Sequence, residues 1–162
     1  MTIATNREAL DNGSPGGCRV RGIARQVIDG AGTTTALTAG QSGALVLFST
    51  AAGQVYTLPA IGANDVGMYF DFAVSVTGTG SYSIDTDAAT TFIGGSVFGA
   101  STTAGGADVF AGDIAASVSI DLDDTTTGED AGGCITLTAL STTTWFANGY
   151  TVGSGTIATP FA

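Results

Sequence analysis

Short segments in which apolar and polar residues alternate, separated by clusters of glycine, serine and aspartate, are the feature that most constrains this fold. The clearest segment covers residues 68–76, where every second position is apolar: Met68, Phe70, Phe72, Val74 and Val76. A two-residue period places such side chains on one face of a β-strand. Shorter segments of this kind recur at 54–58, 81–85, 116–122, 134–140 and 144–152. The pattern predicts a β-rich chain.

Strong helix formers are scarce: the chain has no lysine, and its two glutamates are Glu8 and Glu129. Threonine, serine and glycine fill the polar positions, a composition that favours strands and turns over helices. We therefore predict an all-β fold, a single antiparallel sandwich or barrel-like domain of about 8–10 short strands, of jelly-roll or β-tulip type. Residues 33–162 form this body. Within it, residues 78–80 are predicted to connect a hairpin, residues 141–143 another, and residues 94–113 to form a long surface loop.

The charge is distributed unevenly along the chain. The four basic residues all lie in the first 25 positions: Arg7, Arg19, Arg21 and Arg25. Only two acids accompany them, so this segment carries a charge of +2. The other twelve acids follow it in a stretch of sequence that contains no basic residue. Residues 1–32, with the turn-rich run DNGSPGG at 11–17, are predicted to be an extended N-terminal arm. A flexible terminus and an interaction segment both fit, and the clustered arginines favour interaction. An acidic body repels phosphates, so we expect no nucleic-acid partner.

No segment predicts a membrane helix, because the longest apolar run covers only residues 44–48. The charged N-terminal residues do not resemble a secretion signal, so we expect synthesis in a cytoplasm. The two cysteines, Cys18 and Cys134, lack the paired spacing of a metal site. Cys134 is predicted to be a small buried residue, and a reducing cytoplasm argues against a disulfide between the two.

Histidine and lysine are both missing, which removes histidine-based triads, histidine-ligated zinc, Schiff-base chemistry and phosphate-binding loops. A carboxylate pair is the catalytic option that remains. The candidates are Asp85 with Asp87, and the group Asp121, Asp123, Asp124, Glu129 and Asp130. Each set has two interpretations, a calcium or acid–base site and ordinary turn chemistry in a solvated acidic loop. We favour the second, and expect no catalysis, no cofactor and no metal.

Two adjacent aromatic residues, Trp145 and Phe146, lie in the last predicted strand pair. They fit a stacking platform for a sugar, but a large aromatic residue in a β-protein is more often part of the core. We therefore predict a core position.

Four short motifs carry a resemblance that covers roughly residues 35–162: LTAGQSG at 37–43, VYTLPA at 55–60, ITLT at 135–138 followed by Trp145, and GSGTIATPF at 153–161. They resemble a family of head decoration (cement) proteins of tailed phages, especially marine ones. The resemblance implies a β-rich virion protein without catalytic residues. It implies a homotrimer on the outer capsid surface that binds the major capsid protein and braces neighbouring capsomers.

The arm lies outside that resemblance, so its role rests on charge. We expect Arg7, Arg19, Arg21 and Arg25 to anchor the protein to capsid carboxylates through paired hydrogen bonds. The alternative is a fibre or receptor-binding component whose loops or Trp145 contact host glycans. A third, weaker alternative is a carboxylate-based hydrolase that uses Asp85, Asp87 or the 121–130 group.

Overall fold

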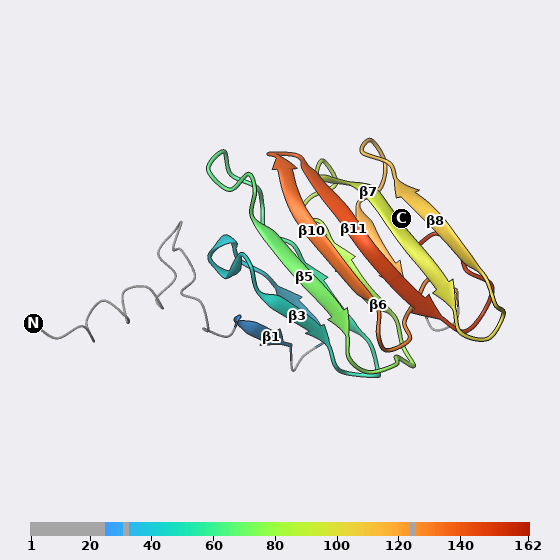
Figure 1. The fold of residues 1–162 in the computed structure, drawn as a ribbon. Helices are drawn as coiled ribbons and strands as arrows, with labels where there is room; N and C mark the ends of the chain where they lie inside the picture. The colour runs from blue at the N-terminus through green and yellow to red at the C-terminus, as the bar shows by residue number, and fades with distance from the viewer. Residues whose placement is uncertain (1–24, 31–32, 124–125) are drawn as a thin grey trace, which may run out of the picture.

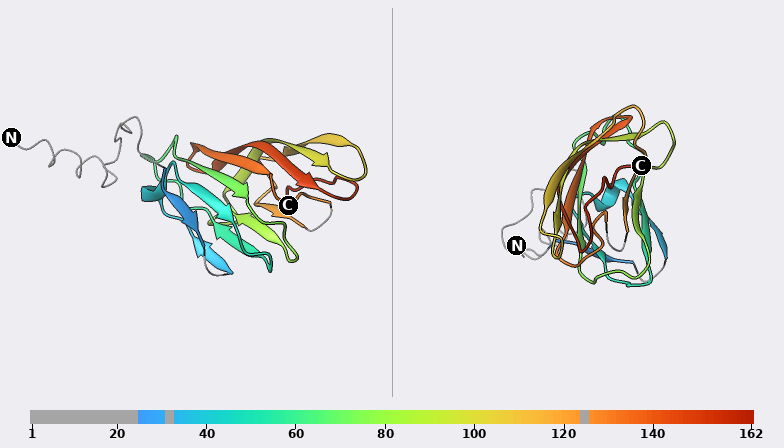
Figure 2. Two further views of the ribbon diagram at one scale, coloured as in Figure 1. Left: turned by 60° about the horizontal axis from the view of Figure 1, so that its bottom comes forward. Right: turned by 90° about the vertical axis from the view of Figure 1, so that its right-hand side faces the viewer.

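The computed structural model describes residues 25–30, 33–123 and 126–162. These residues form eleven β-strands, one short 3-10 helix, η1 (Ala39–Gln41), and no α-helix. The strands lie in two sheets that face each other, as the end view in Figure 2 shows. The predicted all-β class is therefore confirmed.

The two sheets differ in size (Figure 1). The large sheet has seven strands in the order β1 (Val27–Asp29), β3 (Leu45–Phe48), β5 (Tyr69–Val74), β10 (Cys134–Ser141), β11 (Thr144–Gly153), β7 (Phe92–Ser101) and β8 (Ala107–Gly112). The small sheet has four strands in the order β2 (Thr34–Ala36), β4 (Gln54–Thr57), β6 (Tyr82–Asp85) and β9 (Ser119–Leu122).

The first six strands alternate between the two sheets, odd-numbered strands in the large sheet and even-numbered strands in the small one. Each connection crosses to the other layer, so the next strand that joins a sheet runs in the same direction as its predecessor. Strands β1, β3 and β5 are accordingly parallel, and so are β2, β4 and β6. We call these six strands the interleaved half. The predicted antiparallel sandwich is wrong for this half, and β11 also pairs with β7 in parallel.

Two predicted hairpins have different outcomes. The one at 78–80 is wrong, because β5 and β6 belong to different sheets and the segment between them crosses the sandwich. The backbone N–H of Thr79 donates to the carbonyl of Ala51 at 2.6 Å and fixes that crossing. The hairpin at 141–143 is confirmed, since β10 and β11 pair antiparallel from Cys134 opposite Tyr150 to Ser141 opposite Thr144.

The loop predicted at 94–113 is also wrong, because this stretch contains most of β7 and all of β8. Its glycines provide close packing within the sheet. A Cβ on Gly95 would lie 2.1 Å from the carbonyl oxygen of Ala147, and Gly95 has a φ of +99°. A Cβ on Gly112 would lie 2.5 Å from the carbonyl oxygen of Ile93. Glycine in a strand marks a close backbone approach as well as a break.

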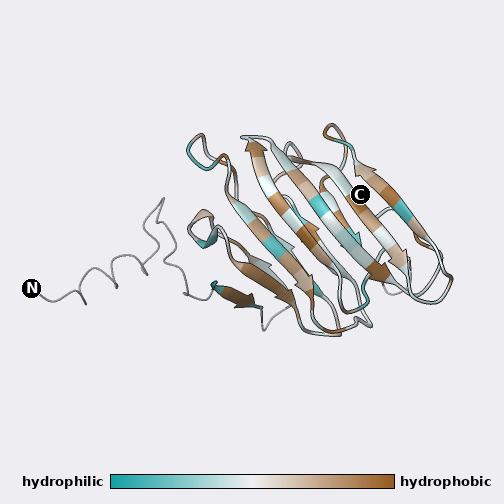
Figure 3. Ribbon diagram, in the orientation of Figure 1, coloured by the Kyte–Doolittle hydropathy of each residue, from teal (hydrophilic) through white to brown (hydrophobic). Residues whose placement is uncertain are grey.

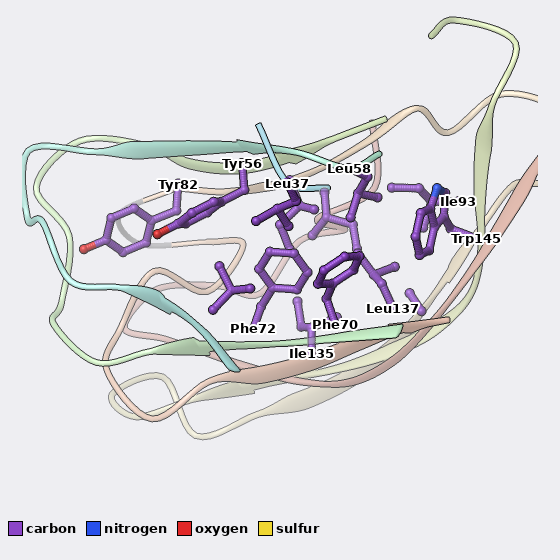
Figure 4. Packing of buried hydrophobic residues seen from close by; sticks show 14 of the residues in the cluster. Leu37, Tyr56, Leu58, Phe70, Phe72, Tyr82, Ile93, Ile135, Leu137 and Trp145 are labelled. Carbon is purple, nitrogen blue, oxygen red and sulfur yellow. The ribbon is translucent and has the colours of Figure 1, made fainter. Parts of the chain in front are cut away.

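The space between the sheets is filled by aromatic and branched aliphatic side chains (Figure 4). Phe48 stacks on Tyr82 with ring centroids 4.7 Å apart and meets Tyr56 edge to face at 5.2 Å. Phe70 packs against Trp145 at 6.1 Å. Burying such a side chain contributes about 1.5–3 kcal/mol. Aromatic residues from both sheets thus hold the two layers together.

The core side of β5 agrees with the alternating pattern of residues 68–76 for its first four members: Met68, Phe70, Phe72 and Val74 are buried. The prediction that Val76 shares this buried face is wrong, because Val76 lies beyond the end of β5 and its side chain is 39% exposed.

Both ends of the described chain join the sheets. At the N-terminal end, β1 lies within the span predicted as an arm and pairs with β3. At the C-terminal end, the tail runs along the edge of β9, where Asp121 N–H donates to Pro160 O at 2.7 Å and Ser119 N–H donates to Ala162 O at 3.0 Å. The tail therefore covers an edge that would otherwise be open to pairing.

Candidate functional site

Arg25 was predicted to bind a partner, and the structure places it in contacts within the chain. Its Nε donates to Gly43 O and its Nη2 to Ala44 O, both at 3.0 Å, and Nη2 lies 2.6 Å from Asp71 Oδ2. These contacts join Arg25, two residues before β1, to the two residues that precede β3 and to the middle of β5. The described part of the chain therefore begins at the β1 edge of the large sheet. Arg7, Arg19 and Arg21 lie outside the described residues.

The outer surface of the large sheet carries a row of apolar side chains from neighbouring strands. Tyr150 of β11 is paired with Phe98 of β7, which in turn is paired with Val109 of β8. Their exposed fractions are 46%, 44% and 68%. The row continues across the sheet to Cys134, which is paired with Tyr150, and to Ala73, which is paired with Cys134.

A second row crosses the same surface nearer the β10–β11 turn. Tyr69 and Phe146 flank Thr138, and each is 39% exposed. Gly94, the neighbour of Phe146, is covered by the exposed side chain of Ile114, since a Cβ there would lie 2.3 Å from Ile114 Cγ2. We call the surface formed by the outward residues of β5, β10, β11, β7 and β8 the aromatic face. Figure 3 shows the alternation of apolar and polar residues along these strands.

Between the two aromatic rows runs a polar row with a single charge. It contains Asp71, Thr136, Asn148 and Ser96, which are register neighbours in that order. Asp71 is neutralised by Arg25 and accepts a hydrogen bond from Thr136 Oγ1 at 2.5 Å. Among the outward positions of these five strands, all of them described, Asp71 is the only ionisable carboxylate. The aromatic face therefore has no net charge.

The small sheet presents the opposite character. On its outer surface Ser83 lies between two carboxylates and donates to Asp121 Oδ1 at 2.7 Å while contacting Asp85 Oδ1. Asp87 lies in the turn after β6 and is exposed. In the described part of the chain, no group of three or more histidine, cysteine, aspartate or glutamate side chains is placed to hold a metal ion.

In the acidic loop after β9, the first carboxylate accepts hydrogen bonds from nearby residues of the turn, as the interpretation of ordinary turn chemistry predicts. Asp123 Oδ1 accepts hydrogen bonds from the backbone N–H groups of Thr126 and Thr127, each at 3.0 Å, and from the Thr126 hydroxyl at 2.9 Å. Partial burial acts against the charged form, but these bonds outweigh it and lower the pKa of Asp123. Asp124 lies outside the described residues, and Asp130 is partly exposed.

Glu129 departs from the predicted solvated loop because its side chain is fully buried. A Cβ on Gly78 would lie 1.7 Å from Glu129 Oε1, so the carboxylate occupies space that only glycine leaves open. Burial, and then the nearby Glu129 charge, raise the pKa of Tyr82. The prediction of a solvated loop is thus wrong for Glu129, because the loop folds back to form a bridge with Val152.

Trp145 is fully buried, so the core interpretation is confirmed and the alternative of a glycan contact through Trp145 is excluded. Its indole N–H has no hydrogen-bond acceptor among the described residues. Phe146 points the opposite way and belongs to the aromatic face, so the core interpretation is wrong for Phe146. Adjacent residues of a strand point to opposite sides, and sequence reasoning had treated the two as a unit.

Cys134 was expected to be buried and is only partly so. It carries a free thiol at the border of a narrow apolar recess that Phe48, Phe72 and Tyr150 also line. Burial and the Asp71 charge raise the pKa of this thiol, while Arg25 acts in the opposite direction. Cys18 lies outside the described residues. The described residues include no helix long and apolar enough to cross a membrane.

Searches of family models, curated proteins and solved structures found no match to this chain. The resemblance to phage decoration proteins therefore stays a prediction, and so does the jelly-roll or β-tulip type.

Proposed function

We propose that this chain is a non-enzymatic structural protein of a virus particle that decorates the outer capsid surface, as a homo-oligomer bound to the major capsid protein. The observation that carries the proposal is the arrangement around Arg25. This residue ties the N-terminal edge of a two-layer body to the middle of β5, and the other three arginines precede it in the sequence.

The proposal gives different roles to Arg25, to the other three arginines and to the acidic body. Arg25 is used inside the chain, which leaves Arg7, Arg19 and Arg21 as the arginines of the extended arm that contact capsid carboxylates. Arginine binds carboxylates with two parallel hydrogen bonds, which gives orientation as well as attraction. The body supplies a compact, anionic block that keeps the particle surface soluble. The family resemblance implies that the oligomer is a homotrimer.

A binding assay on capsids that lack this protein tests the proposal. Removal of residues 1–24 leaves Arg25 and β1 in place, so we expect an unchanged thermal unfolding midpoint and a loss of capsid binding. Replacement of Arg7, Arg19 and Arg21 with alanine should weaken binding at least about 10-fold. The matched lysine variant keeps the charge and should bind with intermediate affinity. Unchanged binding of the truncated chain would refute the proposal.

The second candidate is glycan adhesion, and the exposed rings of Tyr150 and Phe98 on neighbouring strands are the observation in its favour. Flat rings flanked by Asn148 and Ser96 offer both stacking and hydrogen bonding. Calorimetric titration of the purified chain with dextran, xylan and bacterial cell-wall polysaccharide tests it. Binding that disappears in the Tyr150→Ser variant would favour adhesion over decoration.

A further inference from the structure

The acids of this chain are distributed so that one surface is free of net charge. The whole chain carries −10, yet the aromatic face contains one carboxylate, and Arg25 neutralises it. Of the other described acids, Asp29 points outward from β1, two strands away from the aromatic face, and the rest lie at strand edges, in loops, on the small sheet or in the interior: Asp65, Asp85, Asp87, Asp108, Asp113, Asp121, Asp123, Glu129 and Asp130.

Exposed apolar side chains show the opposite distribution. Of the ten large apolar residues that are exposed in the described chain, six belong to the aromatic face: Tyr69, Phe98, Val109, Leu140, Phe146 and Tyr150. Aromatic enrichment and depletion of charge are the two features that distinguish the centre of a protein interface from the remaining surface. Tyrosine in particular contributes strongly at such centres.

We propose that the aromatic face is the contact surface between two copies of this chain. The charge distribution favours a second copy of this chain as the partner at this surface. Two chains of −10 repel each other at any acidic surface, and the aromatic face is where a second copy can approach without placing carboxylates against carboxylates. The face is also self-complementary, because two apolar rows with a polar row between them can meet the same rows of another copy. Such a contact forms a dimer across a two-fold axis, whereas the family resemblance implies a trimer.

The inner structure of the face supports a preformed contact. Thr136 Oγ1 and Arg25 both hold Asp71, so the one carboxylate of the face is already paired before a second chain arrives. Tyr150, Phe98 and Val109 sit on paired strands of a packed sheet, so their positions are fixed by the backbone. Little ordering is then required on association. This inference does not depend on the proposed capsid role, because it concerns the purified chain alone.

The test measures molar mass by light scattering behind size-exclusion chromatography, over an about 100-fold range of protein concentration. The full chain is expected to reach at least twice 15.9 kDa. The double variant Phe98→Ser with Tyr150→Ser should weaken association by about 30-fold or more, as loss of interface centres does. Val55→Ser, on the outer surface of the small sheet, is the matched control and should associate like the unmodified chain.

Circular dichroism and the thermal unfolding midpoint confirm that each variant is folded. Because the face is neutral, association should persist at about 0.5 M NaCl, where exposed charge pairs are screened. A monomeric unmodified chain, or equal association of the double variant, would overturn the proposal. Association that is lost both at high salt and on removal of residues 1–24 would also overturn it, because that result would assign the contact to the arm. A monomer that binds polysaccharide through Tyr150 would assign the face to glycans instead.

Discussion

Arg25 and Asp71 are joined by an ion pair of 2.6 Å across 46 positions of sequence, and this pair lies at the border of the aromatic face. The arginine also donates two hydrogen bonds to the backbone of Gly43 and Ala44. One side chain therefore holds the chain next to β1 against the large sheet and neutralises the carboxylate of the polar row.

Replacement of Arg25 with alanine is expected to lower the free energy of unfolding by about 1–2 kcal/mol. The ion pair is partly exposed and contributes under about 1 kcal/mol, and the two backbone hydrogen bonds add a similar amount. Urea unfolding of Arg25→Ala, Asp71→Asn and the double variant measures the coupling between the two side chains. A coupling free energy of zero would show that the pair does not stabilise the fold.

Gly78→Ala is expected to cost about 1–3 kcal/mol, because the added methyl group would overlap the Glu129 carboxylate in a buried site. Combining it with Glu129→Ala removes the overlap and should cost less than the sum of the two single variants. Gly40→Ala is the control, since nothing lies within 4 Å of a Cβ there. Equal unfolding free energies for Gly78→Ala and Gly40→Ala would contradict the buried position of Glu129.

The neighbours Trp145 and Phe146 should respond very differently to truncation. Trp145→Ala leaves a cavity between the sheets and is expected to cost about 3–5 kcal/mol. Phe146→Ala removes an exposed ring and should cost under about 1 kcal/mol in the monomer. Guanidinium unfolding of both variants at low protein concentration tests this contrast, and similar midpoints would mean that the two residues are not on opposite sides of β11.

The Cys134 thiol should react slowly with iodoacetamide at pH values where an ordinary cysteine is already alkylated. Its raised pKa keeps it in the unreactive thiol form, and the reaction rate should rise only as pH passes that higher value. Arg25→Ala removes the charge that lowers the pKa, so its rate profile should move further to alkaline pH. The measurement uses a Cys18→Ser background. A profile unchanged by Arg25→Ala would show that Arg25 does not act on the thiol.

The fold class was predictable because burial imposes the two-residue period directly, as Phe70 and Phe72 show. The connections were not, since the pattern of one strand does not say which sheet it joins. Residues 78–80 have the composition of a hairpin and instead cross between layers. Gly95 and Gly112 look like turn residues, yet they permit close contact between β7 and its neighbours.

The candidate surface followed the same division. Trp145 was correctly placed in the core because size favours burial. The aromatic face was missed because it arises from register: Tyr150 and Phe98 are 52 positions apart and become neighbours only when β11 pairs with β7 in parallel. Arg25 was assigned to a partner because the basic residues were counted as one group, and sequence did not show that Asp71 lies beside it.

The interleaved half has a consequence for how this molecule can change in size. Each successive pair of strands adds one strand to both layers at once, so a duplication or deletion of one such pair would widen or narrow the whole sandwich and leave every remaining contact in register. The growing end is the one formed by β1 and β2. Loss of β1 and β2 would leave β3 and β4 as the new sheet edges at the cost of the Arg25 contacts, whereas loss of the β10–β11 hairpin, which is paired on both sides, would divide the large sheet.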